Sequence, residues 1–132
     1  MYEEKINAYF DAPERRAELV EAISRLVRIR SVREEPLPGM PFGPGPAAAL
    51  AEGLKLAEEL GFATRNYDNY VGTADLNDKE TALHILCHLD VVGEGTGWTV
   101  TEPYAPKEVH GMLYGRGNDH AKGPVAAVLL AM

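Results

Sequence analysis

Two residues capable of chemistry stand in an otherwise apolar run, HILCHLDVV, at positions 84–92. Because side chains alternate along a strand, His88 and Asp90 are expected on one face and Cys87 on the other. A histidine that binds zinc commonly donates its second ring N–H to a carboxylate, and an H-x-D pair at a strand end has those residue types. A hydrogen-bonded structural pair has them too, so the triplet alone leaves both interpretations open. His84, on the same face, is expected to be a partly buried structural residue.

A second cluster, LYGRGNDHAKGP, spans residues 113–124 and contains three glycines together with Asp119 and His120. Glycines at a strand-to-helix junction let the backbone approach a ligand closely or adopt positive φ. Asp119 and His120 precede the start of an apolar helix, so both are candidate metal ligands. The alternative is a glycine-rich connection with solvated charges. The G-x-G does not continue as G-x-G-x-x-G, so nucleotide binding is poorly supported.

The elements that must position these residues alternate between helical and strand patterns. Apolar residues at three- and four-residue spacing predict helices, and alternating runs predict strands with a turn at Asp68-Asn69. The predicted elements are helices at about 12–29 and 46–60, strands within about 62–90 and 108–114, and a final helix from about 122. This order indicates an α/β fold. The apolar last helix stops at Met132 without a polar turn, which leads us to expect that residues 1–132 are part of a longer domain.

Composition excludes several classes of function. The net charge is −7 and the pI about 5.0, with no basic face of the kind that nucleic-acid binding requires. No secretory signal pattern is present, and no apolar run reaches the roughly 18 residues of a membrane span. The single cysteine, Cys87, rules out an intrachain disulfide, so the expected compartment is the cytoplasm. Neither nucleic acid nor membrane is an expected partner.

Taken together, HLDVV…GW and the later YGRG…KGP resemble the di-zinc metallopeptidases that include carboxypeptidase G, aminoacylase and succinyl-diaminopimelate desuccinylase. The bacterial dipeptidase branch of Xaa-His or carnosinase type is the most similar. Three upstream segments, LVRIRSVREE, PFGPGPAAAL and LAEELGFATRNYDNYVG, extend the resemblance over nearly the whole chain. The resemblance implies the N-terminal part of a three-layer α/β/α catalytic domain with two zinc ions per site, manganese or cobalt being alternatives. It also implies hydrolysis of a peptide or amide bond in a dipeptide-like substrate by a metal-activated water.

The resemblance assigns roles to individual residues. His88 matches a zinc ligand, and Asp90 matches the catalytic-site aspartate that orients it. The family pattern G-R-G-x-x-D-x-K-G places a metal-bridging aspartate where this chain has His120, and Asp119 stands one position early. A carboxylate can bind two cations through its two oxygens, whereas a neutral imidazole offers one lone pair to one metal. Three possibilities follow: Asp119 is re-aimed into the site, the site holds one metal, or it holds none.

Three functional hypotheses remain at this point. The chain is the N-terminal part of a metal-dependent dipeptidase, or a catalytically inactive relative that keeps the fold, or a small module that binds a peptide or anion. The resemblance also implies a glutamate general base and further metal ligands, but residues 121–132 contain no acidic residue and no histidine. Those groups therefore cannot come from the last twelve residues of this sequence. The expected partner is a small peptide, and association into a homo-oligomer is left open.

Overall fold

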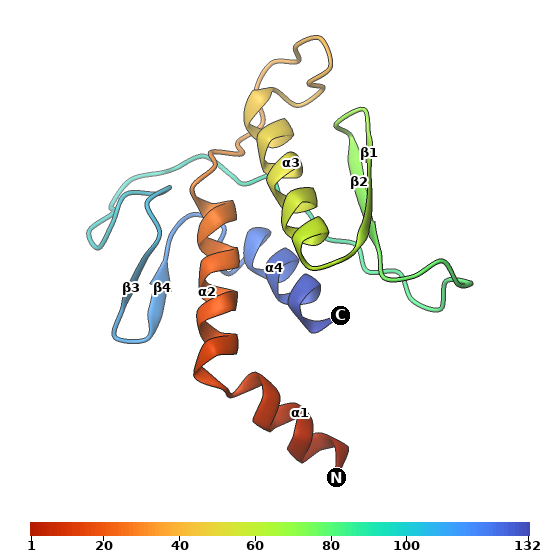
Figure 1. Cartoon of the computed structure of the whole chain (residues 1–132). Coiled ribbons are helices and arrows are strands. Elements are labelled where there is room, and N and C mark those ends of the chain that lie inside the picture. The colour runs from red at the N-terminus through yellow and green to blue at the C-terminus, as the bar shows by residue number, and fades with distance from the viewer.

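The computed structural model describes all residues from 1 to 132, which form four helices and four short strands (Figure 1). In chain order these are α1 (Tyr2–Phe10), α2 (Pro13–Val27), α3 (Pro44–Glu59), β1 (Ala63–Tyr67), β2 (Val71–Asp75), β3 (Lys107–Val109), β4 (Met112–Tyr114) and α4 (Lys122–Ala131). The mixture of helices and small sheets confirms the predicted α/β class. None of the four helices combines the length and apolar character needed to cross a membrane.

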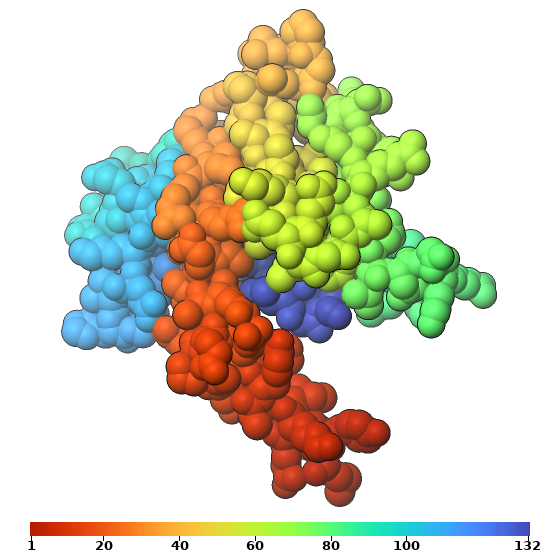
Figure 2. All heavy atoms as spheres, viewed as in Figure 1, coloured from red at the N-terminus to blue at the C-terminus, as the bar shows by residue number.

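Helices α2, α3 and α4 pack together around a small apolar core. Pro13 and Pro44 stand in the first turns of α2 and α3, where the fixed φ of proline suits a helix start. The core cluster takes Ala22 and Leu26 from α2, Leu56 from α3 and Ala126 from α4. Helix α1, which the sequence analysis did not predict, buries no residue and projects from the body of the molecule, shown in red in Figure 2.

The strands form two separate antiparallel hairpins. In the first, β1 pairs with β2 in the register Ala63↔Asp75 to Tyr67↔Val71. The predicted turn at Asp68-Asn69 is confirmed, since both residues have positive φ, 52° and 58°, and lie in the three-residue loop 68–70 that joins β1 to β2. Helix α3 packs against this hairpin, with Leu50 and Leu54 approaching Gly72 on β2. The second hairpin pairs β3 with β4.

The strand predicted over residues 81–90 is not formed. A strand requires a hydrogen-bonded neighbour, and no strand of this chain pairs with residues 81–90. The segment is instead held by a backbone hydrogen bond from the Val91 N–H to the Ser31 carbonyl oxygen (3.1 Å). The predicted alternation nevertheless persists at its end, where Cys87 and Leu89 are half-buried while His88 and Asp90 are exposed.

Candidate functional site

His88 and Asp90 form a side-chain pair at the surface. The Nδ1 atom of His88 lies 3.1 Å from an Oδ1 oxygen of Asp90. With the hydrogen on Nδ1, the ring donates to the carboxylate and the lone pair of Nε2 is free to bind a cation. This is the arrangement of a metal-binding histidine with an orienting carboxylate.

His120 lies beside His88 although thirty-two positions separate them in the sequence. The two ring centroids are 5.0 Å apart, and the ring planes meet at 63°. Asp119 is exposed and takes part in no hydrogen bond or ion pair. This geometry argues against the first of the three possibilities, that Asp119 is re-aimed into the site. His120, and not Asp119, is the residue that lies beside His88.

The donor set of this site fits zinc in kind but not in number. Two imidazole nitrogens are suitable zinc donors, but a catalytic zinc usually has three protein ligands. No group of three or more histidine, cysteine, aspartate or glutamate side chains in the chain is placed to hold a metal ion. His84 is exposed, so the expectation that it is partly buried is wrong, and Cys87 has no sulfur partner. The two imidazoles alone are therefore too few donors for a catalytic zinc site.

The loop between β4 and α4 lies directly against the segment that contains His88. A Cβ at Gly117 would come within 2.8 Å of Cγ1 of Val91, and φ of Gly117 is +86°. Only glycine fits such a close approach with positive φ at low cost. Ala121, next to His120, is a buried non-glycine residue with φ of 83°. Such a conformation costs free energy and persists only where the surroundings hold it.

Two polar residues that the sequence analysis did not single out lie buried behind the site. Ser31 and Lys122 are both fully buried. The Ser31 hydroxyl donates to the Leu89 carbonyl oxygen (2.6 Å), and the Lys122 ammonium donates to the Ile29 carbonyl oxygen (2.5 Å). The only sequence signals were the place of Lys122 in the KGP end of the glycine cluster and that of Ser31 in the segment LVRIRSVREE. Neither signal predicts the two hydrogen bonds, because both bonds join residues far apart in the chain.

Burial lowers the pKa of the Lys122 ammonium from its ordinary value of 10.5 to about 8. Between these two pH values the unfolded chain binds more protons than the folded chain, so the free energy of unfolding should rise with pH across this window. Below pH 8 both states are protonated and the cost of burying the charge is fully present. We expect the wild-type protein to gain up to about 3 kcal/mol relative to Lys122→Met between pH 7 and pH 10.5.

Urea unfolding of both proteins at several pH values measures this difference. The comparison cancels the titration of tyrosines and other groups that the two chains share. A stability difference that stays constant from pH 7 to pH 10.5 would show that Lys122 keeps an ordinary pKa in the folded chain.

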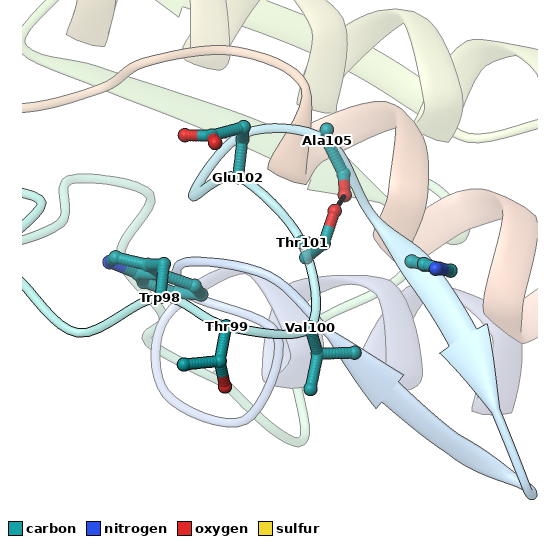
Figure 3. Close-up of a pocket in the computed structure, with 7 residues that line it drawn as sticks. Trp98, Thr99, Val100, Thr101, Glu102 and Ala105 are labelled. Carbon is teal, nitrogen blue, oxygen red and sulfur yellow. Dashed lines mark hydrogen bonds between the residues drawn. The ribbon is translucent and has the colours of Figure 1, made fainter.

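A surface pocket of about 370 Å³ lies in the loop before β3, apart from the histidine pair. Figure 3 shows its lining, in which the Thr101 hydroxyl donates to the Ala105 carbonyl oxygen at 2.5 Å. The indole of Trp98, also in the lining, donates to the Glu94 carbonyl oxygen (2.8 Å) and lies under the Arg116 guanidinium. None of the predicted site residues lines this pocket.

Comparison with known proteins shows that this chain is similar to peptidases. The protein-family model described as "Peptidase family M20/M25/M40" matches residues 84–132, and this range includes every predicted site residue. "Putative dipeptidase YtjP" of Bacillus subtilis is 36% identical over 120 residues, covering 89% of this chain and 26% of the relative. "Putative dipeptidase SSP1012" of Staphylococcus saprophyticus is 34% identical, covering 100% of this chain and 27% of the relative.

Within the peptidases, these matches support a fragment of a protein of family M20/M25/M40. This confirms the resemblance drawn from HLDVV and YGRG…KGP. The chain spans about a quarter of the length of the curated relatives it matches.

Proposed function

We propose that this chain supplies one side of the active site of a metal-dependent dipeptidase. The observation that carries the proposal is the contact of His88 with Asp90, 3.1 Å between Nδ1 and Oδ1, with the His120 ring 5.0 Å away. Zinc is the proposed metal, and manganese and cobalt suit the same donors. The proposed substrate is a dipeptide, in keeping with the names of the relatives, which describe them as dipeptidases.

The residues of this chain would bind and orient the metal. Asp90 would accept the Nδ1 hydrogen of His88, which would fix the tautomer that leaves Nε2 free for a cation. His120, whose ring lies beside that of His88, would supply a second nitrogen. When bound, a metal of this kind polarises the scissile carbonyl and lowers the pKa of a water molecule. Because each imidazole binds one cation, these two side chains favour a single metal on this side of the site.

A catalytically inactive relative is the second candidate. His120 stands where the family pattern has an aspartate, and this one observation favours it.

The remaining expectation, a cytoplasmic location, rests on the single Cys87, whose thiol has no partner in the chain.

Cobalt(II) titration followed by absorbance and calorimetry tests the metal site directly. We expect His88→Ala to lower the affinity for cobalt(II) by at least about tenfold, and Asp90→Asn to lower it by about tenfold through loss of ring orientation. His84→Ala is the matched control, since it removes an exposed histidine from the same segment. Equal affinity in wild type and His88→Ala would overturn the proposed metal site. Comparing the number of cobalt(II) ions bound by the wild-type chain and by His120→Asp then tests whether the histidine at this position limits the site to one metal.

A further inference from the structure

We propose that the 29–31 segment, which follows helix α2, sets the distance between the two halves of the metal site, with Ser31 and Lys122 as its positioning residues. The inference rests on the proposed function, because it concerns how His88 and His120 are brought together. It assigns a role to two buried polar side chains that do not themselves reach the metal.

Ser31 holds the half of the site that contains His88 and Asp90. Its hydroxyl donates to the carbonyl oxygen of Leu89 (2.6 Å), the residue between that pair. Its own carbonyl oxygen accepts the N–H of Val91 (3.1 Å). Ser31 therefore binds the backbone immediately before and immediately after Asp90. These bonds matter because residues 81–90 have no strand partner to fix them.

Lys122 holds the half that contains His120. Its ammonium group donates to the Ile29 carbonyl oxygen (2.5 Å), just past the C-terminal end of α2, where a cation interacts favourably with the helix dipole. Its backbone N–H donates to the Gly117 carbonyl oxygen (3.1 Å) at the start of the loop. The same residue thus closes the loop that carries His120 and attaches this loop to α2.

The two attachments meet on neighbouring residues. Ile29 and Ser31 are two positions apart, so their carbonyl oxygens can be separated by no more than a few peptide units, each at most about 3.6 Å long. This short span connects two loops whose histidines lie thirty-two positions apart in the sequence. A buried hydrogen bond lost on either side would leave an unpaired carbonyl and free that loop to move. The spacing of the two imidazoles therefore depends on both Ser31 and Lys122.

The test follows the two histidine rings in the metal-free chain by NMR, and then measures cobalt(II) affinity. In the wild-type protein, rings with centroids 5.0 Å apart should give a nuclear Overhauser effect between their protons. We expect Ser31→Ala and Lys122→Met to lose this signal and to weaken cobalt(II) binding about 10- to 100-fold, while circular dichroism shows retained helices. Lys122→Arg, which keeps a cationic donor, should recover part of both.

Ser24→Ala is the matched control, because Ser24 is a buried serine on α2 that makes no side-chain hydrogen bond to the site. It should keep both the ring signal and the affinity. A ring signal that persists in Ser31→Ala overturns the inference, and this variant decides the test even if Lys122→Met fails to fold. The ring signal needs no metal, so a chain that binds no cobalt(II) would refute the proposed function while the positioning role is still decided.

Discussion

Replacing Gly123 by alanine is expected to lower the free energy of unfolding by about 3 kcal/mol or more. Gly123 lies in the first turn of α4, where the preceding loop folds back over the helix. An added Cβ would lie 1.9 Å from the carbonyl oxygen of Asn118 and 2.9 Å from its carbonyl carbon. Both are backbone atoms, so no change of side-chain rotamer can relieve the contact.

The loop cannot move aside without breaking hydrogen bonds. The Asn118 side chain donates to the Leu113 carbonyl oxygen, and the N–H groups of Lys122 and Gly123 both donate to the Gly117 carbonyl oxygen at 3.1 Å. Displacing this loop would also move His120 away from His88. We therefore expect Gly123→Ala to lose cobalt(II) affinity together with stability.

Gly93→Ala is the control for this substitution. Gly93 has no heavy atom within 4 Å of an added Cβ, and its φ lies outside the left-handed region. Its stability should stay within about 0.5 kcal/mol of the wild type. Urea unfolding followed by circular dichroism measures both variants, and equal stabilities for the two would contradict the tight packing of the loop on α4.

The parts of the fold that sequence predicted well depend on local interactions. Helices α2 and α3 were predicted within two residues at each end, because apolar spacing and a proline in the first turn are local signals. The first hairpin turn followed from Asp68-Asn69, since both residue types tolerate positive φ. Helix α1 escaped prediction because it has no apolar face that becomes buried.

The failures come from interactions between distant residues. The run at 81–90 has the alternation of a strand, but a strand exists only where another strand pairs with it. Alternation was still enough to predict that His88 and Asp90 share one face, which is exposed in the structure. It could not predict that His120 lies beside them, because the contacts in this region join distant residues: Ser31 binds Leu89, and Lys122 binds Ile29.

Leu26→Ala is expected to leave the chain largely unfolded. Leu26 is fully buried and packs in the core cluster that joins α2, α3 and α4. Truncating a buried leucine costs about 2–5 kcal/mol through lost burial and the cavity that remains. Only 16 of the 132 residues are buried, so the apolar surface available to offset chain entropy is small. The loss should therefore approach the whole free energy of unfolding.

Leu86→Ala makes the same chemical change at an exposed position. Leu86 is 95% exposed in the segment before His88, so its truncation should change the free energy of unfolding by less than about 0.5 kcal/mol. Far-ultraviolet circular dichroism and urea unfolding at 25 °C compare the two variants. A Leu26→Ala protein as stable as Leu86→Ala would mean that the three helices do not share one core.

The same two variants also separate folding from metal binding. Leu86→Ala should bind cobalt(II) as the wild type does, whereas Leu26→Ala should lose affinity because α2 and α4 no longer hold the loops of His88 and His120 together.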